Sequence, residues 1–201
     1  MNAPDNFFLP DVQSAADTRR LAIQQVGVKG LRYPMQFETS RGEVMNTIAH
    51  LTMTVGLPPE VKGTHMSRFV ELLEGRSGSL TQDGAFRMLE EMLLRLDARS
   101  GRIEMSFPYF IRKTAPVSGV ESLLDYDATL IIEQAEGQAA SLTLRVVAAV
   151  TSLCPCSKKI SDYGAHNQRS HVTIKARLSE HMWIEELIDI AESEASCELY
   201  G

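Results

Sequence analysis

The sequence predicts an α+β fold in which pairs of strands alternate with helices. Stretches that alternate apolar with polar side chains, the pattern of half-buried strands, occur in pairs along the chain. Other stretches have apolar residues at intervals of three and four, which is the spacing of amphipathic helices. The order strand, strand, helix, helix, strand, strand begins again in the last third of the sequence, which suggests a repeated unit.

The composition is that of an ordinary globular protein. The 201 residues include 44% apolar and 23% charged side chains, the average mixture for soluble domains, and a chain of this size can bury roughly 70% of its extended surface. The net charge of −6 argues against a nucleic-acid-binding protein held by phosphate attraction. It does not exclude an anionic small substrate, because a basic pocket can lie in an acidic protein.

Targeting signals and cysteine usage indicate the compartment. No stretch approaches the ~20 consecutive apolar residues of a membrane-spanning helix, and residues 1–10 lack the basic-then-apolar order of a secretion signal. Three cysteines, two of them one residue apart, make a poor disulfide framework and favour a thiol or metal site in a reducing compartment. We therefore expect a cytoplasmic protein with no membrane partner.

The first two strands are expected after an N-terminal arm. Residues 1–30 are polar and broken by prolines, so we expect an extended arm. A strand over 31–39, a turn at 41–43 and a second strand over 44–57 follow, and apolar and polar residues alternate along the second strand. Pro58-Pro59 ends that strand.

Two helices are expected next. The first is capped by Thr64 or Ser67 and ends at Gly75, and its shared apolar face consists of Phe69, Leu72 and Leu73. The second begins at Thr81 and has Gly101 as its stop signal. Its apolar face consists of Phe86, Leu89, Leu93 and Leu96.

The rest of the chain predicts four strands and a helix. The strands cover 103–113, 122–134, 141–151 and 170–178, and the helix covers 182–195. The inward face of this helix is expected to consist of Trp183, Leu187, Ile190 and Ala191.

The element order divides the chain into an arm and two modules. We assign residues 1–30 to the arm, 31–135 to a first module and 141–201 to a second module that is incomplete, since a second helix and two more strands would be needed to complete the copy. The missing elements would leave a sheet edge and apolar helix surface around Trp183 and Leu187 without cover.

The chemistry of the chain is concentrated in residues 152–172. This segment holds Cys154 and Cys156 in a Cys-Pro-Cys turn directly after an apolar strand, followed by His166 and His171. The arrangement places two soft ligands or nucleophiles at the exit of one strand, with imidazoles arriving on the way into the next. We interpret the segment as a functional site.

Five separated segments carry further motifs: Leu51–Val55, Lys62–Phe69, Lys113–Gly119, Leu123–Asp127 and Cys154–His171. Together they resemble the type IB GTP cyclohydrolases, the prokaryotic first enzymes of folate-type pterin synthesis. The similarity runs from about Asp11 to the last residue, so it covers nearly the whole sequence.

The resemblance implies a tunnelling fold, or T-fold, in which antiparallel sheets close into a barrel with helices on the outer face. The two-copy element order would correspond to a bimodular subunit, and subunits of the family form a homotetramer with active sites at their interfaces. Members are hydrolases that convert GTP and water to 7,8-dihydroneopterin triphosphate and formate in tetrahydrofolate and pterin biosynthesis. The expected partners are therefore GTP and copies of the same chain, without nucleic acid or membrane.

The resemblance also implies a divalent metal, Zn²⁺ or Mn²⁺, held by Cys154 and His166, with Cys154 as the catalytic residue. In the family a glutamate and a histidine complete the metal shell, and another glutamate anchors the guanine. These positions lie beyond the last residue of this sequence, so we expect it to hold half of the shell. Glu198 lies just before those positions and is not expected to fill either role.

Other candidate residues have less specific patterns. Cys156 would shape the loop or act as an accessory thiol, and a redox pair with Cys154 is the rival role for both, although the proline between them restricts the turn that would join the sulfurs. His171 begins a strand and would be packed, hydrogen-bonded or a proton carrier.

The remaining histidines and the acids of the last helix have ordinary explanations. His65, with Lys62 and Arg68, precedes a helix and could meet a triphosphate at its positive start, while capping and packing is an equal alternative. His50 and His181 are expected to be surface or hydrogen-bonded histidines. A solvated helix face is expected to hold Glu185, Glu186, Glu192 and Glu194.

Two other functions remain open at this point. The nitrile reductase of queuosine synthesis shares the tunnelling fold and a cysteine, although the Cys-Pro-Cys-to-His166 segment argues against it. A catalytically impaired fragment that binds metal or supports assembly is the non-enzymatic reading, and the missing metal ligands favour it.

Overall fold

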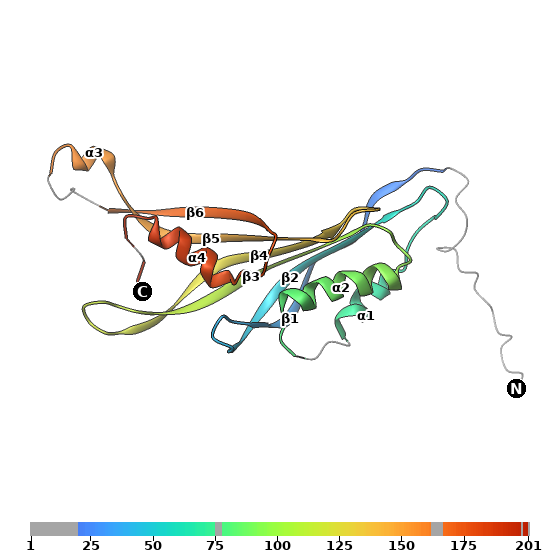
Figure 1. Ribbon diagram of the computed structural model, residues 1–201, viewed down its shortest axis with the longest axis horizontal. Helices are drawn as coiled ribbons and strands as arrows, with labels where there is room; N and C mark the ends of the chain where they lie inside the picture. The colour runs from blue at the N-terminus through green and yellow to red at the C-terminus, as the bar shows by residue number, and fades with distance from the viewer. Residues whose placement is uncertain (1–19, 75–77, 162–166, 198, 201) are drawn as a thin grey trace, which may run out of the picture.

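The computed structural model describes residues 20–74, 78–161, 167–197 and 199–200. In chain order, the elements are β1 (Ile23–Glu38), β2 (Val44–Leu57), α1 (Ser67–Glu74), α2 (Gln82–Arg95), β3 (Gly101–Thr114), β4 (Glu121–Gln134), β5 (Ser141–Leu153), α3 (Pro155–Lys158), β6 (Asn167–Leu178) and α4 (Ile184–Ser193). The six strands form one antiparallel sheet in the order β1-β2-β3-β4-β5-β6, so each strand pairs with the next (Figure 1). The predicted α+β class is confirmed.

The sheet consists of three long hairpins that are joined over part of their length. Pairing runs along most of β1–β2, β3–β4 and β5–β6. Between hairpins the ladders are shorter, and they join His50–Val55 to Gly101–Ser106 and Asp127–Glu133 to Ser141–Val147. The hairpins therefore separate at one end of the sheet, the end of β5 that leads into α3 (Figure 1).

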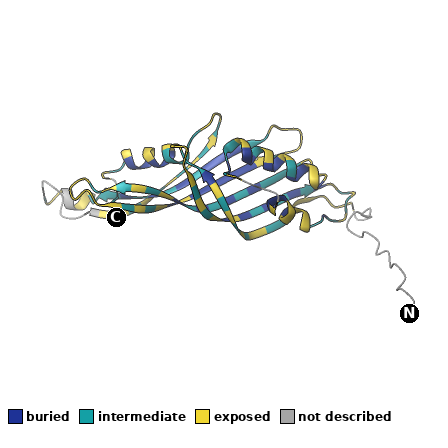
Figure 2. Ribbon diagram, turned by 90° about the horizontal axis from the view of Figure 1, so that it is seen from below, coloured by how far each residue is buried: buried dark blue, intermediate teal, exposed yellow. Residues whose placement is uncertain are grey.

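One face of the sheet carries the core. The alternation predicted for β2 is confirmed, since Ala49, Leu51, Met53 and Val55 are buried. They share one cluster with side chains of α1, α2 and α4, among them Phe69, Leu89, Met92, Ile188 and Ala191. Figure 2 shows this distribution, with buried residues along the strands beneath the helices. No helix in the described residues is long and apolar enough to cross a membrane.

Two element boundaries differ most from the sequence prediction. β1 begins at Ile23, not Leu31, and its first half pairs with β2, where a Cβ on Gly27 would lie 2.0 Å from the Met53 carbonyl oxygen. α2 ends at Arg95, before the predicted stop at Gly101, because Asp97 has a φ of 48° and so leaves the helical conformation. Gly101 is instead the first residue of β3 and lies close against the α2 side chains.

Helix α4 faces the core with a different set of residues than predicted. In α4 the prediction is confirmed for Leu187 and Ala191 and wrong for Ile190, which is 47% exposed. Ile188 is buried in its place. In α2, Thr81 caps the helix as expected. Leu187 is only 3% exposed, so the expectation of uncovered surface around it is also wrong. The division into an arm and two modules stays a prediction.

Candidate active site

Cys154 lies where β5 leaves the sheet. β5 ends at Leu153, and α3 begins at Pro155. Because β4 has already separated from β5 here, the C-terminal segment takes its place: the Thr151 amide donates to the Cys197 carbonyl (3.0 Å), the Cys197 amide donates back (3.3 Å), and the Leu153 amide donates to Ser196 Oγ (3.2 Å). Cys154 is half-buried. The strand that leads into it is held on one side by β6, which pairs up to Leu153, and on the other side by Ser196 and Cys197.

The second predicted metal ligand, His166, lies outside the described residues, and so does Glu198. Cys156 is exposed within α3, and Cys154, Cys156 and Cys197 form no disulfide with one another. Within the described ranges no three His, Cys, Asp or Glu side chains are grouped so as to hold a metal. The fit of a divalent ion thus rests on the donor chemistry of Cys154 and His166, a thiolate and an imidazole, which suits zinc.

A cavity of about 240 Å³ opens in the gap between β4 and β5. Its polar lining comes from β4, β6 and the C-terminal segment: Asp125, Asp127, Arg169, His171 and Tyr200. His171 is exposed and pairs in register with Ala149, so it faces this cavity and is not packed into the core. A larger cavity of about 610 Å³ lies between α2, β1 and β2, on the opposite edge of the sheet from the β5–β6 hairpin that leads to Cys154.

The structure does not bring His65, Lys62 and Arg68 to Cys154 within one chain. Arg68 Nη1 donates to the carbonyl oxygen of Arg95 (2.8 Å), which ties α1 to the end of α2. α1 and α3 lie toward opposite ends of the molecule (Figure 1). Packing is therefore the role that the contacts show for Arg68. His50 is exposed as predicted, and exposed His181 stacks edge-on against Trp183 at 4.6 Å.

A buried polar cluster near this end of the sheet escaped the sequence prediction. Glu192 is 4% exposed and is not part of a solvated face; it forms an ion pair with Lys113 of β3, and its Oε1 accepts a hydrogen bond from Tyr126 Oη of β4 at 2.5 Å. Lys113 and Tyr126 belong to two of the motifs noted in the sequence. The sequence prediction missed Glu192 because it placed Ile190 on the inward face instead of Ile188, and Glu192 lies four residues after Ile188 on the same helix face.

Of the other three acids that were predicted to be solvated, Glu185 and Glu186 form hydrogen bonds within the chain. Glu185 Oε1 accepts hydrogen bonds from the Ser40 amide (2.9 Å) and hydroxyl (3.1 Å), which ties α4 to the β1–β2 turn. Glu186 Oε2 accepts a hydrogen bond from the Trp183 amide (2.6 Å) at the start of α4. For exposed Glu194, the expectation of a solvated position is confirmed.

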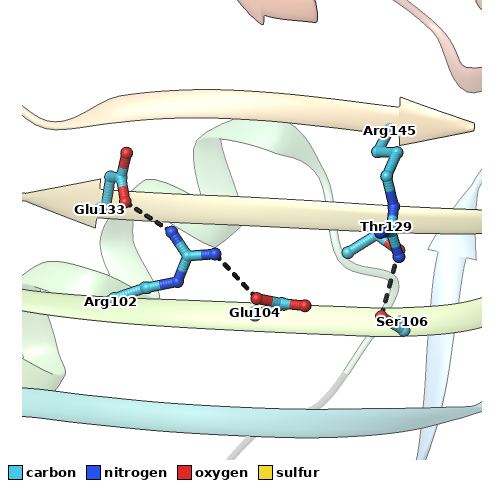
Figure 3. A network of polar contacts seen from close by, with 6 residues as sticks. All are labelled: Arg102, Glu104, Ser106, Thr129, Glu133 and Arg145. Atoms are coloured by element: carbon cyan, nitrogen blue, oxygen red, sulfur yellow. Dashed lines mark hydrogen bonds and ion pairs between the residues drawn. The ribbon is translucent and has the colours of Figure 1, made fainter. Parts of the chain in front are cut away.

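The helix-free face of the sheet carries a second polar network (Figure 3). Arg102 donates to Glu104 (2.8 Å) and Glu133 (2.6 Å), while Arg145 donates to Thr129 (3.0 Å). Burial acts to lower the pKa of Arg102, but the hydrogen bonds to the two carboxylates outweigh it, and the pKa is raised. The charges on β3 and β4 are thus largely satisfied within the chain.

Comparisons with known proteins identify the relatives of this chain. Residues 9–201 match the family described as type I GTP cyclohydrolase folE2. "GTP cyclohydrolase FolE2 1" of Dechloromonas aromatica is 74% identical over 201 residues, which is all of this chain and 76% of that protein.

Two further relatives agree with this match. "GTP cyclohydrolase FolE2" of Azoarcus sp. is 52% identical over 201 residues, all of this chain and 75% of that protein. The protein of the same name from Burkholderia pseudomallei is 57% identical over 195 residues, 97% of this chain and 73% of its own length. The chain therefore belongs to the type I GTP cyclohydrolase FolE2 family.

Proposed function

We propose that this chain hydrolyses GTP to 7,8-dihydroneopterin triphosphate and formate. The observation that carries the proposal is the match over residues 9–201, reinforced by 74% identity to a protein named GTP cyclohydrolase. The position of Cys154 supports it, since the Cys-Pro-Cys loop extends from a fixed strand next to a polar cavity. The nitrile reductase is not favoured by any of these observations.

The reaction opens the imidazole ring of guanine, and we assign the activation of water to Cys154 and His166. Water adds at carbon 8, the formyl group leaves as formate, and the ribose then rearranges and closes the new ring. A divalent ion held by the Cys154 thiolate and the His166 imidazole would lower the pKa of a bound water and so supply hydroxide near neutral pH. The antiparallel pairing of Thr151 with Cys197 would hold the loop while the ring opens.

We further propose that the sheet is part of a tunnelling fold in a homotetramer of bimodular subunits. Helices cover only one face of the sheet (Figure 1), and the other face carries polar side chains such as Arg102, Glu104 and Arg145. β1 and β6 are the outer strands of the sheet among the described residues. Leu80 bridges the outer edge of β1 at Phe37, and the rest of that edge and the edge of β6 leave backbone donors and acceptors open to another copy.

Formate release from GTP tests the proposed function. We expect metal-dependent formate release in the presence of Zn²⁺ or Mn²⁺, and a loss of at least about 100-fold for Cys154→Ala, because loss of a direct ligand should exceed the effect of outer residues. Cys156→Ala is the matched control, since it removes an exposed thiol two residues away, and it should keep most of the activity.

Metal binding supplies an independent measurement. Equilibrium dialysis should show weak Zn²⁺ binding that is abolished in Cys154→Ala and reduced in His166→Ala. Tight stoichiometric zinc in Cys154→Ala would contradict the ligand assignment, and formate release unaffected by Cys154→Ala would contradict its catalytic role.

A further inference from the structure

The outward face of β6 is entirely without acidic side chains. Arg169, His171, Lys175 and Arg177 alternate along the strand and are exposed, and Thr173 completes the row. The residues between them, such as Val172 and Ile174, pack against the core. β5 adds Arg145, which is paired in register with Lys175. A stripe of this kind is unexpected in a chain whose net charge is −6.

The basic side chains of β6 have no ion-pair or hydrogen-bond partners among the described residues, unlike those of the adjacent hairpin. On β3 and β4, Arg102 pairs with Glu133 and Glu104, and Arg112 pairs with Glu121 (3.5 Å). Within the described residues, the side chains of Arg169, His171, Lys175 and Arg177 make no ion pair or hydrogen bond. The positive charges of Arg169, Lys175 and Arg177 are therefore available to a ligand, and His171 can add a ring N–H donor.

One end of the stripe lies beside the candidate active site. Arg169 is paired with Thr151, three residues before Cys154, and these three residues span roughly 10 Å in an extended strand. Such a distance is similar to the reach from the purine ring to the outer phosphates of a nucleoside triphosphate. Arg169 and His171 both line the 240 Å³ cavity, whereas Lys175 does not.

We propose that Arg169 and His171 bind the triphosphate of the nucleotide substrate on the β6 side of the cavity between β4 and β5. The proposal rests on the proposed function. Guanidinium groups form paired, charge-assisted hydrogen bonds with phosphate oxygens, and the i, i+2 spacing of the two residues places both on the same face, about 7 Å apart along the strand.

The opposite wall of the cavity fixes the orientation of the ligand. Asp125 and Asp127 line this wall from β4 and would repel phosphate. The triphosphate is therefore held against β6. The two walls predict effects of opposite sign: removal of a positive charge from β6 weakens anion binding, and removal of a negative charge from β4 strengthens it.

Calorimetric titration of the 201-residue chain with inorganic tripolyphosphate and with GTP tests the assignment. Arg169→Gln should weaken both ligands about tenfold, the loss of one charge-assisted phosphate contact, and Arg169→Lys should recover part of the affinity. Lys175→Gln is the control, because it makes the same charge change on the same face roughly 20 Å further along the strand; it should change affinity by less than about twofold. Asp125→Asn should tighten tripolyphosphate a few-fold.

The outcomes separate this site from the reaction itself. The phosphate site would be overturned if the Arg169→Gln and Lys175→Gln variants bound tripolyphosphate with equal affinity, or if the wild-type chain did not bind it. Formate release by wild type alongside either result would leave the proposed function intact. Tripolyphosphate binding that depends on Arg169, in a chain that releases no formate from GTP, would establish the anion site and refute the proposed function.

Discussion

At the scale of single residues, two buried tyrosines near helix α4 have opposite environments. Tyr126 Oη donates to Glu192, whereas the buried Tyr109 Oη and the buried Glu185 Oε2 lie near one another without ordinary hydrogen-bond geometry. Burial raises the pKa of the Tyr109 phenol, and the Glu185 carboxylate adds to the shift. A buried hydroxyl without a partner costs free energy, so Tyr109 is a position where the native residue does not maximise stability.

The two tyrosines predict different effects on stability, and Tyr109 predicts a dependence of stability on pH. Tyr109→Phe should leave the free energy of unfolding unchanged or raise it, while Tyr126→Phe should lower it by about 1 kcal/mol or more. The raised pKa means that the folded state keeps the Tyr109 proton when the unfolded state loses it, so stability should fall as the pH rises above about 10.

Urea unfolding at pH 8 and at pH 10.5 measures both effects. Tyr109→Phe should reduce the loss of stability between the two pH values. A cost of 1 kcal/mol or more for Tyr109→Phe at pH 8 would show that its hydroxyl is satisfied, contrary to the geometry.

At the scale of elements, α4 connects hairpins that the sheet alone leaves apart. Its Glu185 contacts Ser40 in the β1–β2 turn, and its Glu192 contacts Lys113 and Tyr126 in the β3–β4 hairpin. The same helix packs on β5. Since the Lys113 and Glu192 side chains are only 13% and 3% exposed, their charges depend on one another for solvation.

Removal of one partner from this ion pair should therefore be costly. We expect Glu192→Ala to lower the free energy of unfolding by about 3–5 kcal/mol, because it leaves Lys113 buried without its counter-ion. The double change Lys113→Met with Glu192→Leu should recover most of the loss, since a well-packed apolar pair can replace a buried ion pair. Arg95→Ala is the control, because it breaks the exposed pair with Glu91 and should cost less than 1 kcal/mol. A loss of less than 1 kcal/mol for Glu192→Ala would contradict the proposed role of this ion pair in joining α4 to the β3–β4 hairpin.

The elements also show what the sequence could and could not predict. Strand β2 and helix α1 were predictable because alternation and three-to-four spacing report burial on one face directly, and Ala49 and Phe69 are buried as expected. The first half of β1 was missed because most of its side chains are exposed, with only Val26 and Val28 packed against the core, so the apolar alternation is short. The cavity residues Asp125 and Arg169 belong to strands distant in sequence, and their proximity depends on where β4 leaves β5, which no local pattern encodes.

At the scale of the whole molecule, the sheet is long, covered by helices on one face and open at β1 and β6 among the described residues. Exposed apolar side chains gather near the separated end of the β3–β4 hairpin, where Phe110, Val117, Val120 and Leu123 are at least 40% exposed. Open edges and exposed apolar surface together favour association with further copies.

This surface predicts a concentration-dependent assembly. Sedimentation velocity over a hundredfold range of protein concentration should show a tetramer that dissociates on dilution, and the melting temperature should fall in parallel, because association stabilises the folded chain by mass action. Leu123→Asp places a charge on the exposed hairpin and should shift the equilibrium toward smaller species without unfolding the chain, while Leu94→Asp, on the exposed face of α2, is the matched control. A monomer whose melting temperature does not change with concentration would rule out the homotetramer and would require the open edges of β1 and β6 to be stable in solvent.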